Sequence, residues 1–181
     1  MVRVRKQLQN HEKEQRTAKD RLQPALLDRL IDQAPEKRQE SHEQVMITSE
    51  VLRDAVLRDL TWLLNTANLQ SSYDLTEFPH VQKSCLNYGV SALAGERMSE
   101  IDLVTMEGSL KSAILAYEPR IDEASIDVRC VAEANTLEHH NILSLVIMGK
   151  INSTPYPREF LFKTNIDLES GHMDVVDYKS E

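Results

Sequence analysis

The sequence predicts an α+β fold in which N-terminal helices pack on a C-terminal, mainly antiparallel sheet. Up to the Glu118-Pro119 dipeptide, apolar residues recur with helical spacing, whereas after Arg120 they alternate with a period close to two. Pro119 has no backbone N–H and disfavours helical geometry at the preceding residue, so the chain must turn at this point. Helices followed by strands along the chain are typical of the α+β class.

Three helices are expected before the turn. Thr48 and Ser49 can cap the second of them, and its apolar residues, Trp62 included, cover more than half of the helical circumference. A helix of that kind is buried on several sides. The expected ranges are Pro24–Gln33, Val51 to about Asn65, and a helix that begins at the capping box Ser99–Asp102 and ends at Glu118.

Asp59 falls inside the apolar arc of the second helix, at about 100° per residue. A carboxylate in such a position needs a partner, because burying an unpaired charge is strongly unfavourable. Arg120 is the first choice, since a guanidinium offers five donors. The Tyr88 hydroxyl and the Asn87 amide are the alternatives, and a fourth is that Asp59 and Arg120 both face another protein.

Four strands are expected after the turn, joined as a meander. In the first, Ile126, Val128 and Cys130 share one face, and the second is rich in Ile, Leu and Val, which is typical of a central strand. Gly171 suits a tight turn before the last strand. The expected ranges are Ser125–Val131, Asn141–Ile151, Arg158–Leu168 and Met173–Tyr178.

The charge of the chain is uneven. Its 181 residues carry a formal net charge of −8, but residues 1–21 hold seven basic and three acidic side chains. We expect a polar basic arm over residues 1–21 that orders with a partner, a short helix and linker over 22–44, and one domain over 45–181. An acidic body of this kind disfavours nucleic acid as a partner.

The sequence contains few of the residue patterns that are typical of catalytic, metal-binding or cofactor-binding sites. No apolar run approaches the ~18 residues of a membrane span, and no signal peptide is recognisable, so a cytosolic protein with two reduced, buried cysteines is expected. His139 and His140 are neighbours without ligands at a usual spacing, and the five glycines are scattered. We therefore expect no metal and no cofactor.

Three motifs follow one another along the chain. The first includes Arg58, Asp59 and Asn65, the second Asn87, Tyr88 and Gly89, and the third Glu118, Pro119 and Arg120. In this order and spacing, and with a C-terminal Phe-x-x-x-Ile-Asp-Leu-x-x-Gly, they resemble the TssE family, the lysozyme-like baseplate wedge component of type VI secretion systems, which is related to a wedge protein of contractile-tail phages. The resemblance runs from about Asp28 to Tyr178.

The resemblance implies a structural protein in the cytoplasm, within a baseplate docked at the inner membrane. It implies contacts with TssF and TssG of the wedge, and with the sheath subunits TssB and TssC through an added strand. No insertion into the membrane is implied. The alternative is a muramidase-like peptidoglycan hydrolase with Glu118 as general acid. A general acid must be protonated, but Arg120, two residues away, would favour the ionised form of Glu118.

Overall fold

The computed structural model describes residues 25–31, 35–36, 48–95, 101–131, 142–153 and 156–178. The predicted arm over residues 1–21 lies outside them. The chain divides into two units, one formed by Met1–Asp54 with Asn152–Arg158 and the other by Ala55–Ile151 with Glu159–Glu181. The first unit holds the short helix α2 (Leu26–Leu30) and the start of α3. The second unit holds the sheet and the candidate site.

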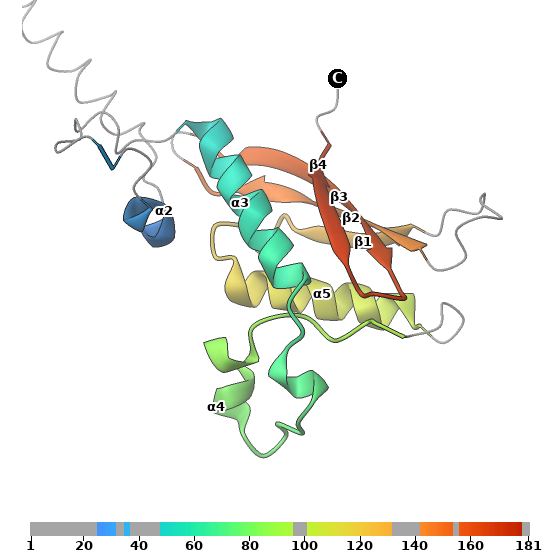
Figure 1. Cartoon of the computed structure of the whole chain (residues 1–181). Helices are drawn as coiled ribbons and strands as arrows, with labels where there is room; N and C mark the ends of the chain where they lie inside the picture. Colours follow the sequence, from blue (N-terminus) through green and yellow to red (C-terminus); the bar gives the residue numbers. More distant parts are fainter. Residues whose placement is uncertain are drawn as a thin grey trace, which may run out of the picture. The chain divides into compact units, whose positions relative to one another are not determined.

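Two long helices precede the strands, as the sequence predicts (Figure 1). Helix α3 spans Ser49–Leu64, and its first turn is capped by the Thr48 hydroxyl, which accepts a hydrogen bond from the Val51 N–H at 3.3 Å. Helix α5 spans Leu103–Tyr117. The predicted capping box is wrong in one respect, because Asp102 itself is the N-cap and its side chain accepts from the Val104 N–H at 3.1 Å.

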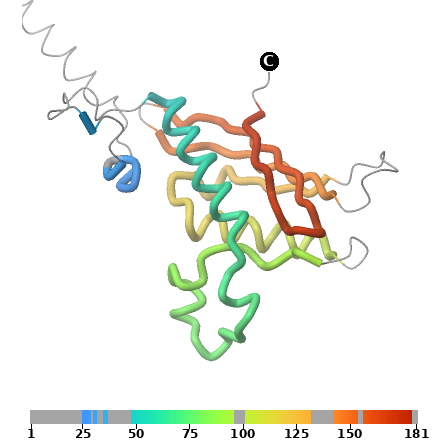
Figure 2. Tube along the Cα trace, in the orientation of Figure 1, coloured from blue at the N-terminus to red at the C-terminus, as the bar shows by residue number. Residues whose placement is uncertain are grey.

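The segment between the two long helices is built from short pieces. They are η1 (Leu69–Ser71), α4 (Pro79–Gln82) and η2 (Cys85–Asn87). Pro79 begins α4, where the missing N–H costs nothing. In Figure 2 this segment leaves the end of α3 and returns towards α5. The return is fixed by a short parallel bridge in which the Val90 N–H donates to the Thr66 carbonyl at 2.8 Å.

The described strands form one antiparallel sheet in the order β1-β2-β3-β4, which confirms the predicted α+β fold. Val128 pairs with Ile147, and Thr164 pairs with Val175. The order makes β2 a central strand, as predicted, and leaves β1 and β4 as the two edges. The strands are β1 (Asp127–Val131), β2 (Ile142–Ile151), β3 (Arg158–Asp167) and β4 (Met173–Asp177).

The core lies on one face of this sheet. Alternate residues of β3 are buried, so that Phe160, Phe162, Thr164 and Ile166 all point inward. Helix α5 packs against β1 and adds its own buried stripe. That stripe runs along Met106, Leu110 and Ile114, and the fully buried Leu60 comes from α3.

Candidate functional site

The turn after α5 is built around Glu118. Its N–H donates to the Ile114 carbonyl at 2.8 Å and closes the helix, as the Glu118-Pro119 break predicts. Its carboxylate turns towards Arg120, the last residue of the third motif. Oε1 accepts from the Arg120 backbone N–H at 3.2 Å and from Arg120 Nε at 2.6 Å. Arg120 Nη2 also donates to Glu118 Oε2. The side chain of Glu118 is only 4% exposed, so this ion pair is largely sheltered from water.

Arg120 also reaches α3. Its Nη2 lies 2.5 Å from Asp59 Oδ2, which confirms the predicted partner of Asp59. The other oxygen, Oδ1, accepts from Arg58 Nε at 2.9 Å and Nη2 at 2.8 Å. We call Arg58, Asp59, Glu118 and Arg120 the charged corner. Its two arginines balance its two carboxylates. The ion pair of Arg120 with Asp59 links α3 to the turn after α5.

The electrostatics of the charged corner are set by burial and by these bonds. Burial opposes the charge of Arg120, but the bonds to Glu118, and then those to Asp59, outweigh it and raise the pKa of Arg120 above its ordinary value. Burial, followed by the negative charges of Asp59 and Glu118, raises the pKa of Tyr88. Arg120 therefore stays charged and Tyr88 stays protonated at neutral pH.

The second motif meets the same corner through aromatic rings. Tyr88 packs edge-on against Tyr117, with ring centroids 5.2 Å apart. The Tyr117 hydroxyl donates to the Ser84 carbonyl at 3.0 Å. The three motifs, far apart in the sequence, thus lie together, as their joint appearance in one domain suggested.

Gly89 is required for this approach. Its φ of +122° is in the region that favours glycine, and a Cβ there would lie 2.2 Å from the Thr66 carbonyl oxygen. The role of Gly89 is therefore to let the second motif pass close to the end of α3.

Asn87 does not contact Asp59, so that alternative is wrong. Its side chain is buried and holds the short segment together: Oδ1 accepts from the Gln70 N–H at 2.9 Å, and Nδ2 donates to the Gln82 carbonyl at 3.0 Å. Asn87 is an internal cross-link between η1 and the end of α4.

Asn65 lies at the C-terminal end of α3 and binds the first residue of β4. Its Nδ2 donates to the Met173 carbonyl at 2.7 Å, and its Oδ1 accepts from the Met173 N–H at 2.9 Å. Nothing in the sequence indicated this contact across 108 positions. We call the pair of bonds the Asn65 clasp.

Two predictions of burial are wrong. Trp62 is 49% exposed, and the Arg58 guanidinium lies 5.0 Å from the centre of its ring, a cation–π contact at the surface. Cys85 is exposed in η2, while Cys130 is partly buried.

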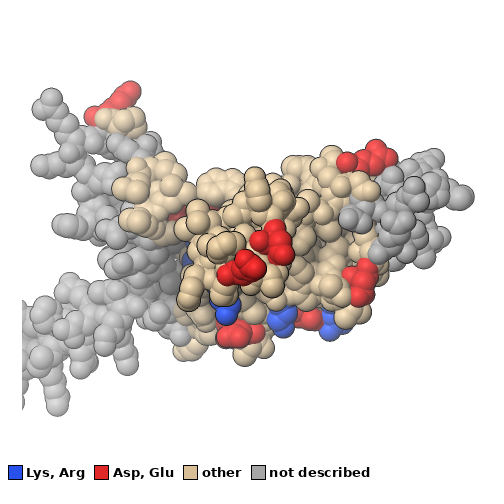
Figure 3. All heavy atoms as spheres, turned by 90° about the horizontal axis from the view of Figure 1, so that it is seen from below, with Lys and Arg blue, Asp and Glu red and all other residues tan. Residues whose placement is uncertain are grey.

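Tyr73, Phe78 and Leu86 are also exposed. Figure 3, which views the molecule from the side of α4, shows a surface formed mainly by uncharged residues.

The charged corner is better suited to holding elements together than to reaction chemistry. Glu118, the candidate general acid of a glycosidase mechanism, is ion-paired with Arg120, which also binds Asp59. Within the described ranges no group of three His, Cys, Asp or Glu side chains could hold a metal ion. None of the helices in the described part of the chain has the length and apolar character that a membrane span requires.

The described domain is thus of the α+β class, with a charged corner between its helices and an open sheet whose edges are β1 and β4. Residues 50–156 match the family model described as baseplate wedge protein gp25. The chain belongs to this family, of which TssE is the type VI homologue. Comparisons with curated proteins and with solved structures gave no match. Membership in the family indicates a structural role in a baseplate.

Proposed function

We propose that this protein is a structural wedge component of a type VI secretion baseplate that connects the wedge to the contractile sheath and starts sheath assembly. Its partners would be TssF and TssG in the wedge, and TssB and TssC in the sheath. It would work in the cytoplasm, within a baseplate docked at the inner membrane. Family membership supports the baseplate role, and the resemblance of the three motifs to TssE supports the type VI assignment.

The observation that carries the sheath contact is the difference between the two edges of the sheet. At the β1 edge, the Cys130 N–H donates to Glu107 Oε1 of α5 at 2.6 Å, so a side chain occupies that edge. Burial, and then the charge of Glu107, raises the pKa of Cys130 to about 11. An edge covered by a helix and a carboxylate resists pairing with another chain.

The β4 edge is different. In the part of the chain that the structure describes, β4 is the last strand of the sheet, and its first residue, Met173, is bound by the side chain of Asn65, which follows α3. Val176 and Tyr178 are 60% and 52% exposed. An exposed strand of this kind can accept a strand of a partner, with main-chain bonds for affinity and side chains for specificity. We therefore assign the sheath contact to β4.

The wedge contact is assigned to the surface beside the charged corner. Arg58 and Arg120 keep 32% and 22% of their side chains exposed, and the half-exposed Trp62 lies against Arg58. Arg and Trp are the residues most enriched at the energetic centres of interfaces. The corner would hold this surface in place while its outer atoms contact TssF and TssG. Residues 1–21, whose charge is basic, remain a proposed partner-dependent arm.

The hydrolase alternative is less well supported, because Arg120 forms an ion pair with Glu118, the candidate general acid. We propose that the protein is not an enzyme. Turbidity of purified cell wall should stay unchanged on adding the protein; lysis that is lost in Glu118→Gln would overturn the proposal.

The proposed assembly role is tested by pull-down of tagged TssF–TssG and of tagged TssB–TssC with the purified full chain. Both pairs should retain the wild type. Trp62→Ala should weaken only the wedge contact, and Val175→Pro only the sheath contact. Retention of neither pair would overturn the proposed function.

A further inference from the structure

The pairing of β3 with β4 decides which backbone groups of β4 face outward. The Asp167 N–H donates to the His172 carbonyl, and the Tyr178 N–H donates to the Leu161 carbonyl. In an antiparallel pair, hydrogen-bonded and non-hydrogen-bonded positions alternate. The positions Met173 and Val175, opposite Ile166 and Thr164, are therefore of the non-hydrogen-bonded kind. Their N–H and C=O groups point away from β3, towards the edge of the sheet.

The Asn65 clasp occupies the first of these outward positions. A side-chain amide presents a carbonyl acceptor and an N–H donor side by side, so it makes the two bonds that the N–H and C=O of one residue in a neighbouring strand would make. The amide is also fixed from its own helix, because Nδ2 donates to the Thr61 carbonyl at 2.8 Å. The edge of β4 is thus closed at Met173.

We propose that the Asn65 clasp sets the register of the strand that adds to β4. A partner strand can bond to the outward groups from Val175 onward, but at Met173 it meets a position already filled by α3. This inference rests on the proposed function, since it assumes that a sheath strand adds at this edge. Register matters because a shift by one residue turns every side chain of the added strand to the other face.

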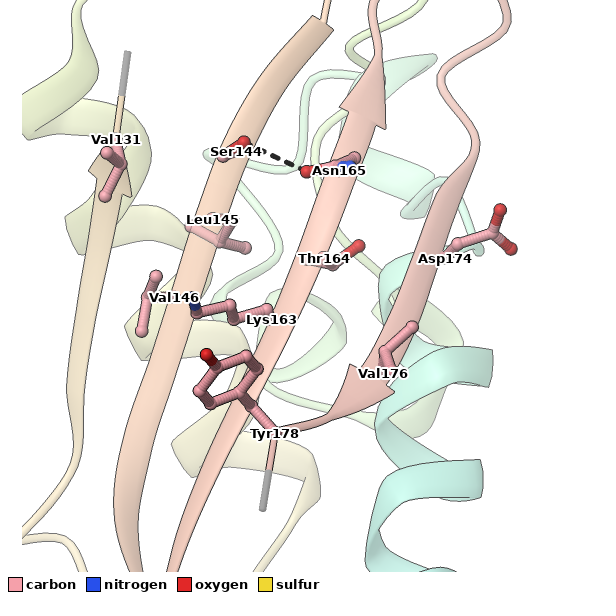
Figure 4. A pocket seen from close by; sticks show the side chains of 10 residues that line it. All are labelled: Val131, Ser144, Leu145, Val146, Lys163, Thr164, Asn165, Asp174, Val176 and Tyr178. Atoms are coloured by element: carbon pink, nitrogen blue, oxygen red, sulfur yellow. Dashed lines mark hydrogen bonds between the residues drawn. The ribbon is translucent and has the colours of Figure 1, made fainter. Parts of the chain in front are cut away.

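The surroundings of Val175 define the chemistry of the added strand. A hollow of about 450 Å³ lies on the outer face of the sheet, lined by Val176, Tyr178 and Lys163 among others (Figure 4). The ammonium of Lys163 lies 3.9 Å from the centre of the Tyr178 ring. Beside this largely apolar stretch stands Asp174, whose side chain is 83% exposed.

The occupant is therefore an extended segment of another subunit that carries an apolar and a basic residue two positions apart. An apolar side chain would lie beside Val176, and the next on that face, a basic one, would lie beside Asp174. The acidic charge of the chain as a whole favours the same partner. In this arrangement Asn65 is a positioning residue for the interface.

Residue-resolved hydrogen exchange of the full chain, alone and with the purified TssB–TssC pair, tests the inference. In the free wild type, the Met173 amide should exchange slowly, and the Val175 amide should exchange rapidly. Adding the sheath pair should protect Val175 and leave Met173 unchanged. In free Asn65→Ala, exchange at Met173 should accelerate about tenfold or more. Adding the sheath pair to that variant should protect Met173 again, because the partner strand can then extend by two residues, from Val175 to Met173.

Two further variants keep the test decisive. Asn65→Asp retains an acceptor for the Met173 N–H but cannot donate to its carbonyl, so it covers the case in which Asn65→Ala fails to fold. Asn165→Ala removes an asparagine from the outer face of the sheet, where it accepts from Ser144, and in the free chain should leave the exchange of both amides unchanged.

The inference and the proposed function fail in different ways. If Val175 is protected by the sheath pair but Met173 of Asn65→Ala stays unprotected, the clasp does not set the register, and the proposed sheath contact stands. If the sheath pair protects neither amide, while Met173 of the free wild type exchanges slowly, the sheath contact at β4 is wrong. Rapid exchange at Met173 in the free wild type would overturn the clasp itself.

Discussion

Arg120 and Asp59 are 61 positions apart in the sequence, yet Nη2 of the arginine lies 2.5 Å from Oδ2 of the aspartate. The same Nη2 also binds Glu118, so one nitrogen joins a carboxylate of α3 to a carboxylate of the turn after α5. Helix α5 ends at Tyr117, directly before this turn, whereas α3 continues past Asp59 to Leu64. The pair therefore fixes the direction in which the chain leaves the helical half and enters the sheet.

The first prediction concerns the strength of this pair. In a double-mutant cycle on the full chain, Asp59→Ala and Arg120→Ala should show a coupling free energy of unfolding of about 2 kcal/mol, between the values typical of exposed and of buried ion pairs, because both side chains are about a quarter exposed. Urea unfolding measures each corner of the cycle. The matched control is Arg129→Ala, whose ion pair with Asp127 is mostly exposed and should contribute less than about 1 kcal/mol.

A coupling near zero, with each single variant stable and unable to bind TssF–TssG, would contradict an internal role. It would indicate that Asp59 and Arg120 act separately at the wedge interface.

Local patterns in the sequence predicted most of the fold. Period-two alternation placed β3 within one residue, because its buried Phe160, Phe162 and Ile166 all face one way. The Glu118-Pro119 break placed the end of α5, since proline leaves no choice there. Asp59 required a partner on energetic grounds alone. Arg120, although distant in the sequence, was the first choice because its guanidinium offers five donors.

Contacts between distant segments could not be predicted in this way. The Asn65 clasp depends on where β4 lies relative to α3, which no local pattern specifies. Trp62 was expected to be buried because apolar residues cover most of α3, but a helix on the outside of a domain exposes part of any wide apolar arc. Cys85 was expected to be buried from residue type alone, and the short turn that carries it faces the surface.

The second prediction concerns Gly89. Gly89→Ala should lower the free energy of unfolding by about 2–4 kcal/mol, since the new Cβ would clash with the Thr66 carbonyl oxygen and the positive φ disfavours alanine. Gly108→Ala in α5 is the matched control: nothing lies within 4 Å of its Cβ, and it should raise stability by about 1 kcal/mol. Chemical denaturation gives both values. Equal effects of the two substitutions would show that the close approach at Gly89 is unimportant.

The third prediction separates the two cysteines by reactivity. The pKa of Cys130, raised from 9.0 to about 11 by burial and by Glu107, leaves about a hundredfold less thiolate at pH 8 than an unperturbed thiol. Cys85 is exposed. Iodoacetamide at pH 8 should therefore label Cys85 first, as mass spectrometry of the digested protein would show. Glu107→Gln should speed labelling of Cys130 and leave Cys85 unchanged; a faster wild-type reaction at Cys130 would contradict the structure.

The fourth prediction uses proline to separate the two sides of β4. The Val175 N–H points to the open edge, so Val175→Pro should leave the sheet intact and prevent an added strand from bonding there. The Val176 N–H points to β3, because Val176 lies opposite Lys163 in a hydrogen-bonded pair. Val176→Pro should therefore lose a bond of the sheet itself and lower the melting temperature by several degrees more than Val175→Pro.

Binding measurements complete the comparison. Val175→Pro should keep the TssF–TssG contact and its melting temperature while failing to retain TssB–TssC or to start sheath assembly. Val176→Thr keeps the backbone N–H and the β-branched shape but places a hydroxyl in the hollow, so it should still start sheaths while retaining TssB–TssC less well than the wild type. If Val175→Pro is stable and still starts sheaths of normal length, the partner strand does not bond to this edge. The contact would then have to lie elsewhere, with the side chains of the outer face as the next surface to substitute.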